Sequence, residues 1–173
     1  MQNAFLSHLR RWGLYLTGSE VRFSQRARFE TKMPDFLGVV QPLLVVPFNF
    51  DATGGKSIAA HNLLDDEGNA IALPDASIIL GSLIHVQTTF TSANDSGTIA
   101  LHANAANDIV TATAISGVGN IWDAGLQVGV PVFTKATAIL LTAARTPKAT
   151  VAVQALTAGK LRGFLFVLLP SGS

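Results

Sequence analysis

Apolar and polar residues alternate along most of the chain beyond the first 35 positions. Between residues 78 and 91, for example, Ile84 and Val86 alternate with His85 and Gln87. A period of two in segments rich in Val, Ile and Thr is typical of half-buried β-strands. The pattern predicts strands at residues 43–50, 78–91, 98–103, 109–115, 137–142, 149–155 and 161–169.

Turn-forming residues separate these segments. Gly, Asn, Asp and Ser are concentrated at residues 51–55, 63–69 and 92–97, and residues 116–129 are rich in Gly. Between Pro34 and Pro170 no segment carries apolar residues at helical spacing. Roughly eight short strands joined by turns predict an all-β fold, an antiparallel β-sandwich with a jelly-roll-like body.

Two of the predicted strands also carry information about their position in a sheet. Pro47 lies within the strand at residues 43–50, and Pro has no N–H to donate, which favours an edge strand. Residues 161–169 are apolar at successive positions, so we expect a central strand that is covered on both faces.

The first 35 residues follow a different pattern. Apolar residues at positions 5, 9, 12 and 16 share one helical face, which predicts a short helix from Met1 to about Gly18. Residues 21–29 then alternate, with apolar side chains on one face and arginines on the other, which predicts an extended segment. The sequence therefore divides into an N-terminal arm, residues 1–35, and a β-sandwich body, residues 36–173.

Charged residues make up only 13% of the chain, and the mean hydropathy is +0.39. Ordinary soluble domains carry about 25% charged residues. The longest apolar run, residues 164–169, is far shorter than the roughly 18 residues of a spanning helix, and no secretory leader pattern is found at the N-terminus. We therefore expect other subunits, rather than a membrane, to cover the surface, and a homo-oligomer is the simplest arrangement.

The arm is basic, whereas the body is slightly acidic. Residues 1–32 hold six basic and two acidic residues, a net charge of +4, and the remainder carries −3. A basic arm of this kind has four possible environments: an acidic protein lattice, nucleic acid, a membrane surface or solvent. We favour a protein lattice over nucleic acid, a membrane surface or solvent, because an alternating strand suits pairing with a neighbour's sheet edge. The residues expected to dock are Phe5, Leu9, Arg10, Arg11, Trp12, Arg22, Phe23, Arg26, Arg28 and Phe29.

Motifs of catalytic chemistry are incomplete. The chain has no Cys, which excludes disulfides and thiolate sites. Residues 53–57 (TGGKS) end like a phosphate-binding loop, but Phe50 stands where the motif requires Gly, so we predict a hairpin turn. Together with the serines, which lack a recognisable base partner, these features predict that the chain is not an enzyme and holds no cofactor.

No metal site is expected either. The four histidines lie in different predicted elements and none has metal-ligand spacing. His85 and His102 fall on neighbouring predicted strands, a placement that would let them face each other across a sheet. The acidic run at residues 65–67 offers oxygen ligands of the kind Ca²⁺ takes, but three acids on a Gly-Asn loop are interpreted as a solvated turn.

Four stretches of the body resemble small virion proteins of tailed phages. They are residues 88–95 (TTFTSAND), 97–101 (GTIAL), 108–116 (DIVTATAIS) and 122–125 (WDAG), and residues 150–161 (TVAVQALTAGKL) are similar to the C-terminal hairpin of those proteins. The likeness covers about residues 42–167. The basic segment 1–35 departs from the pattern.

This resemblance implies a structural protein of the virion. Small β-sandwich proteins of this kind serve as cement or decoration proteins on the capsid, often as trimers. It implies binding to the lattice of the major capsid protein on the outer surface of the virion, after assembly in the host cytoplasm, and no small-molecule substrate. An alternative is a head-fibre or tail part whose loops at residues 65–69 and 116–129 contact a host glycan.

Overall fold

The computed structural model describes residues 14–17, 20–23 and 43–170, and the chain divides into two units, Met1–Thr31 and Lys32–Ser173. In the first unit, β1 (Leu14–Thr17) pairs antiparallel with β2 (Glu20–Phe23). The helix predicted up to Gly18 is therefore wrong for residues 14–17, which form a strand. Residues 1–13 and 24–29 lie outside the described residues.

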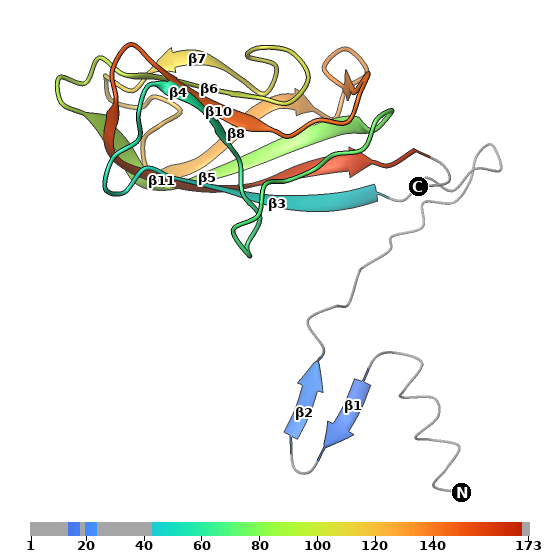
Figure 1. Cartoon of the computed structure of the whole chain (residues 1–173). Helices are drawn as coiled ribbons and strands as arrows, with labels where there is room; N and C mark the ends of the chain where they lie inside the picture. The colour runs from blue at the N-terminus through green and yellow to red at the C-terminus, as the bar shows by residue number, and fades with distance from the viewer. Residues whose placement is uncertain (1–13, 18–19, 24–42, 171–173) are drawn as a thin grey trace, which may run out of the picture. The chain divides into compact units, whose positions relative to one another are not determined.

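The body is built from two antiparallel sheets that lie one above the other (Figure 1). The large sheet has the order β3-β11-β5-β8, with β9 paired to β5, and the small sheet has the order β4-β10-β6-β7. The large sheet contains β3 (Leu43–Asp51), β5 (Ile78–Ser92), β8 (Gly125–Val132), β9 (Ile139–Leu140) and β11 (Leu156–Leu168). The small sheet contains β4 (Ala59–Asn62), β6 (Thr98–His102), β7 (Val110–Ala114) and β10 (Lys148–Ala152). The described residues contain no helix, so the all-β prediction is confirmed for them.

The core lies between the two sheets and is formed by alternate residues of both. Its fully buried members include Phe48 of β3, Ile84 of β5, Leu101 of β6 and Leu165 of β11. Trp122 is also fully buried, although it comes from the Gly-rich segment between β7 and β8. Its ring meets Phe90 edge-on at 5.8 Å, and its indole Nε1–H donates to the carbonyl of Thr113 at 3.1 Å. This loop is therefore fixed to the core.

Pro47 lies where the sequence predicts, on an edge strand. β3 pairs with β11 on one side only, and on the free side the N–H of Asn49 donates to the carbonyl of Leu64 at 2.7 Å. Because N–H groups alternate in direction along a strand, the position of Pro47 also faces the free side, where it supplies no donor. At the free edge of β3, the N–H of Asn49 is therefore already hydrogen-bonded, and Pro47 has no N–H to donate.

The expectation for residues 161–169 is half correct. β11 lies between β3 and β5, which makes it a central strand. Its inner face is buried, but Phe164, Phe166 and Leu168 on the outer face are only partly buried. Continuous apolar character was interpreted as two covered faces, whereas one face of this strand is open to solvent in the single chain.

The sequence missed two strands and overextended a third. β8 begins inside the Gly-rich segment 116–129 and continues to Val132, and Gly129 and Pro131 interrupt its otherwise alternating pattern. β4 was not predicted, and β9 is shorter than the strand expected at residues 137–142. Among the described residues, no helix is long and apolar enough to cross a membrane.

Candidate interaction sites

The predicted docking residues lie in the first unit and are described only in part. Arg22 and Phe23 lie on β2, in the two-stranded hairpin with β1. The other eight lie outside the described residues: Phe5, Leu9, Arg10, Arg11, Trp12, Arg26, Arg28 and Phe29. Arm docking therefore stays a prediction.

The segment that resembles a phosphate-binding loop is a turn. Gly54 and Gly55 have φ angles of +82° and +101°, and the N–H of Gly55 donates to the carbonyl of Ala52 at 2.9 Å. β4 follows this turn at Ala59, in place of the helix whose N-terminus would hold a phosphate. The turn joins strands of different sheets, so the prediction of a hairpin is wrong while that of a tight turn is confirmed.

The histidine pair suggested by the sequence does not form. His85 lies on β5 in the large sheet, and His102 lies on β6 in the small sheet. β5 and β6 follow one another in the chain but belong to different sheets, so closeness in sequence does not make them neighbours. In the part of the chain that the structure describes, no three His, Asp or Glu side chains are grouped as a metal site would require.

The acidic loop at residues 65–69 is held together by its own carboxylates. Asp65 accepts hydrogen bonds from the N–H groups of Glu67 and Asn69, at 3.0 and 2.7 Å. Asp66 forms an ion pair with Arg162 of β11 at 2.7 Å and accepts from the amide of Asn49. These acids stabilise the loop against the edge of the large sheet, which differs from the interpretation as a merely solvated turn.

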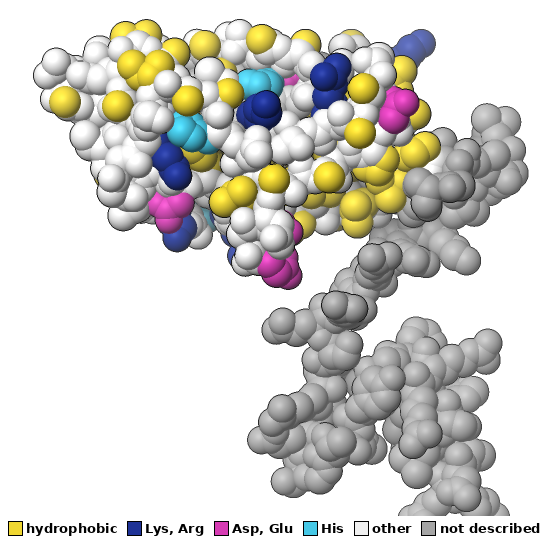
Figure 2. Space-filling model, in the orientation of Figure 1, with side chains coloured by type: hydrophobic (Ala, Val, Ile, Leu, Met, Phe, Trp, Pro, Cys, Tyr) yellow, Lys and Arg dark blue, Asp and Glu magenta, His cyan; other side chains and the backbone are white. Residues whose placement is uncertain are grey.

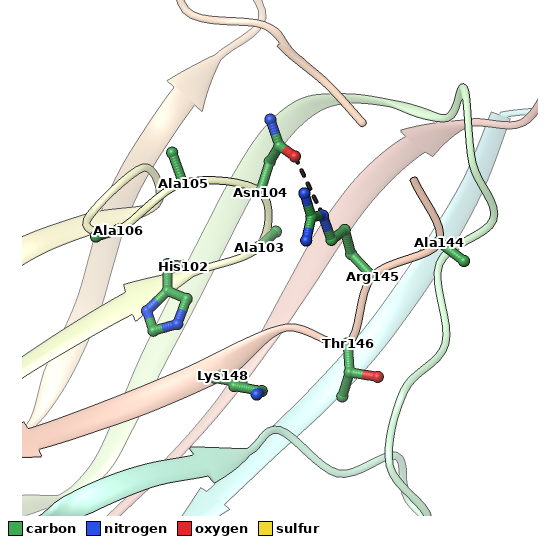
Figure 3. Close-up of a pocket in the computed structure, with 9 residues that line it drawn as sticks. All are labelled: His102, Ala103, Asn104, Ala105, Ala106, Ala144, Arg145, Thr146 and Lys148. Atoms are coloured by element: carbon green, nitrogen blue, oxygen red, sulfur yellow. Dashed lines mark hydrogen bonds between the residues drawn. The ribbon is translucent and has the colours of Figure 1, made fainter. Parts of the chain in front are cut away.

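A polar hollow of about 420 Å³ opens at one end of the small sheet (Figure 3). β6 ends there with His102, and β10 begins there with Lys148, which is its direct partner across the sheet. Arg145 is held in the preceding segment by a backbone bridge to Leu73. The hollow is lined by His102, Ala103, Asn104, Ala105, Ala106, Ala144, Arg145, Thr146 and Lys148.

One carboxylate shapes the wall of this hollow. Asp108 accepts hydrogen bonds from the N–H groups of Ala103, Asn104 and Ala105, each at 2.8 Å. This closes the tight turn after β6. The turn places Asn104 so that its Oδ1 accepts from Nε of Arg145 at 3.3 Å, the dashed line in Figure 3.

The hollow carries positive charge and no acidic lining residue. Neither Arg145 nor Lys148 forms an ion pair with an acid among residues 43–170. Burial lowers the pKa of His102 below its ordinary value of 6.5, and Lys148 lowers it further against the opposing charge of Asp108. Two unpaired cations beside a neutral imidazole suit one anionic group, a carboxylate or phosphate.

Sequence reasoning missed this hollow. Residues 145–148 (RTPK) lie between the predicted strands at residues 137–142 and 149–155, and nothing in the sequence groups them with His102. Their meeting with His102 depends on the pairing of β10 with β6, two strands separated by more than 40 residues. The sequence shows that Arg145 and Lys148 are basic, but it does not show that they line the same hollow.

Comparison with known proteins gives a match in fold alone. The sequence matches no family model and no curated protein. A chain of the cyanophage Pam1 capsid asymmetric unit matches with a TM-score of 0.52 and 17% identity, over 90% of this chain and 98% of that chain. The fold is therefore similar to that of a chain in a phage capsid.

Two further structures agree with this match. A chain from the acid-stable capsid of Helicobacter pylori bacteriophage KHP30 has a TM-score of 0.51 at 13% identity, over 75% of this chain and 89% of that chain. A chain from the capsid of Ralstonia phage GP4 has a TM-score of 0.51 at 14% identity, over 75% and 86%.

Proposed function

We propose that this chain is a structural protein of a tailed phage, a decoration protein that binds the shell of the major capsid protein from outside and stabilises it. The observation that carries the proposal is the likeness of fold over 98% of a chain from the Pam1 capsid, with similar matches in two other phage capsids. The decorating role rests on the small single-sandwich body and on the separate basic arm.

The surface chemistry of the body supports a structural role without catalysis. Several acidic residues on the described surface hold the fold: Asp65, Asp66 and Asp108 hold loops, and Asp51 pairs with Lys160 at 3.2 Å. Hydrogen bonds from Thr53 hold the pKa of Asp51 below its ordinary value, and Lys160 adds to this effect. A clamp on a shell requires complementary surface that can be buried, and it needs no catalytic groups.

The arm supplies the anchor in this proposal. It carries a net charge of +4 over residues 1–32, and its described part is a two-stranded hairpin. An isolated hairpin is marginally stable alone, and its outer edges suit addition to the sheet of a neighbouring protein. Arginines on the same segment suit an acidic lattice. We propose that the copies act as a homo-oligomer.

The proposal is tested by adding the purified protein to capsids that lack it. We expect saturable binding that raises the melting temperature of the capsid, and loss of both effects when residues 1–32 are deleted. A full-length variant in which Arg10, Arg11, Arg22, Arg26 and Arg28 are replaced by Gln separates charge from length. Binding that is unchanged by either variant contradicts anchoring by the arm, and absence of binding to heads removes the decorating role.

The hollow beside Arg145 favours a second candidate, a head-fibre or tail module that binds a host glycan. Its two unpaired cations suit the carboxylate of an acidic sugar. This candidate predicts that Arg145→Gln with Lys148→Gln leaves particles intact but reduces adsorption to host cells. The decorating role predicts normal adsorption by the same particles.

A further inference from the structure

The outer face of the large sheet has a regular composition that follows from strand register. Residues that pair directly across β3, β11, β5 and β8 or β9 form rows on this face. The first row contains Leu43, Leu168, Ile78 and Leu140; the second contains Val45, Phe166, Gly81 and Val132; the third contains Pro47, Phe164, Leu83 and Val128. These three rows carry no polar side chain.

Much of this apolar face is exposed in the single chain. Val128 is 61% exposed, and Val45, Val132 and Leu140 are exposed as well. Phe133 adds its ring, which is 61% exposed, by lying over Gly81 with its centre 5.0 Å from that of Phe166. Figure 2 shows hydrophobic side chains gathered where β3 begins and β11 ends.

The size of the face matches an interface between proteins. Exposed fractions of side chains of this size correspond to an apolar area on the order of 700 Å². A stable interface buries about 800 Å² on each partner, whereas the largest apolar patch on a typical monomer is about 300–600 Å². Exposure of such an apolar area to water is unfavourable in the folded single chain, whether or not a capsid is present.

The border of the face carries charges that are already paired. The next row contains Asn49, Arg162, His85 and Leu126, and Arg162 pairs with Asp66 at 2.7 Å. One step further along β11, Lys160 pairs with Asp51. A partner therefore meets no charge in the three apolar rows that it has to complement, and a second identical face meets no like charge. Two sheets pack face to face through such side chains at about 10 Å.

We infer that the outer face of the large sheet binds a second copy of this chain. The inference rests on the proposed function, in which copies of the chain associate. It locates the contact between two copies on β3, β11, β5 and β8. Interfaces between permanent partners are more apolar than transient ones, which agrees with three rows of aliphatic and aromatic residues.

The test is sedimentation of the isolated full chain over a wide range of concentration. Val128→Glu puts a carboxylate in the third row, and we expect it to raise the dissociation constant at least about a hundredfold, giving the 18.2 kDa monomer. Val118→Glu is the matched control, because Val118 is 105% exposed in the loop before β8 and lies outside the face. Wild type and Val118→Glu are expected to sediment alike as oligomers.

A second measurement reports the contact directly. The chain has no Cys, so Val132→Cys creates a unique site for a spin label on the face. We expect dipolar coupling between labels on different copies, and weaker or no coupling from Val118→Cys. Wild-type protein that sediments as a monomer, or a Val128→Glu oligomer of unchanged mass, overturns the inference.

Other occupants of the face give different results. If wild type is monomeric and Val128→Glu abolishes binding to capsids, the face binds the shell. If deletion of residues 1–35 turns a monomer into an oligomer, the arm covers the face. Self-association without capsid binding overturns the proposed function but supports this inference. Capsid binding by both monomeric wild type and Val128→Glu supports the proposed function but overturns this inference.

Discussion

Single residues in this body act mainly through the space they leave or fill. Gly163 of β11 lies on the inner face, where a Cβ would come within 2.2 Å of the Phe48 ring and 2.7 Å of the Leu83 carbonyl. On the opposite face, Gly81 lies beneath Phe133 in the same manner. A glycine under an aromatic ring lets the ring lie against the backbone, so each of these pairs fixes the position of a large side chain.

Gly163→Ala is expected to destabilise the body by about 1–3 kcal/mol, because the Leu83 carbonyl is backbone and cannot move aside easily. The measurement is the free energy of unfolding from denaturant titration. Gly54→Ala is the control: its Cβ meets nothing within 4 Å, and only the φ of +82° is unfavourable, at a cost of about 1 kcal/mol. Equal losses in the two variants contradict the role of Phe48.

His102 makes stability depend on pH. Its folded pKa is lowered, mainly by burial, so the unfolded chain binds a proton at higher pH than the folded chain. The contribution of His102 to the free energy of unfolding is therefore fully present above its unfolded pKa of about 6.5. It is lost as the pH falls from there through the folded pKa. We expect the melting temperature of wild type to fall more between about pH 7.5 and pH 5 than that of His102→Gln. Parallel curves contradict this assignment.

Much of this residue-level behaviour is invisible in the sequence. The incomplete phosphate-loop motif is recognisable from Phe50 alone, and the turn it predicts is present. Gly163, by contrast, is one glycine among fifteen, and only the register that places it beside Phe48 reveals its role. Packing between strands far apart in the chain decides such cases.

At the scale of elements, the segment between β7 and β8 is ordered by side chains that bond to its backbone. Asn120 donates to the carbonyls of Ile115 and Gly117 at 3.0 and 2.6 Å. Asp123 accepts from the N–H of Gly119 at 2.6 Å, and Trp122 enters the core. Composition indicated a loop here, but it gave no indication that the loop closes one end of the sandwich.

Trp122→Phe is expected to cost about 2–4 kcal/mol of folding free energy. The smaller ring leaves a void beside Phe90 and leaves the Thr113 carbonyl without its indole donor. Val118→Ala in the same loop is expected to change stability by less than about 0.5 kcal/mol, since Val118 is fully exposed. Thermal unfolding of the two variants separates an anchored side chain from a solvent-exposed one.

The strands that the sequence predicts well are those with clean alternation and no interruption, such as β5 and β6. β8 was lost because Gly129 and Pro131 are strand-breaking types, although Val128, Val130 and Val132 keep the period of two. Gly129 is required there because a Cβ would approach Ser82 Oγ and the Ile109 carbonyl at 2.7 and 2.8 Å. The residue that hid the strand thus serves its packing.

At the scale of the whole molecule, topology brings the two ends of the body together. β3 begins the body and β11 ends it, and the two pair over nine residues in the large sheet. Strand order in both sheets departs from chain order, and no property of a single segment encodes it. The sequence therefore predicts the class of fold and an apolar surface, but not which surface is apolar.

A fragment of residues 36–173 is expected to fold alone, with a melting temperature within a few degrees of the full chain. The reason is that the buried core of the body lies between residues 46 and 167 and includes strands of both sheets. Circular dichroism on the fragment checks this. A fragment that shows no cooperative transition contradicts the division between arm and body.

The free edge of β3 also limits how copies accumulate. An apolar sheet with an open edge invites further strands to add without end, which is the route to fibres. Here Leu64 occupies the N–H of Asn49, and Pro47 offers no donor at the next outward position. Strand addition at this edge is therefore hindered at Asn49 and Pro47, so we expect copies to associate through the apolar face of the sheet and not through the edge of β3.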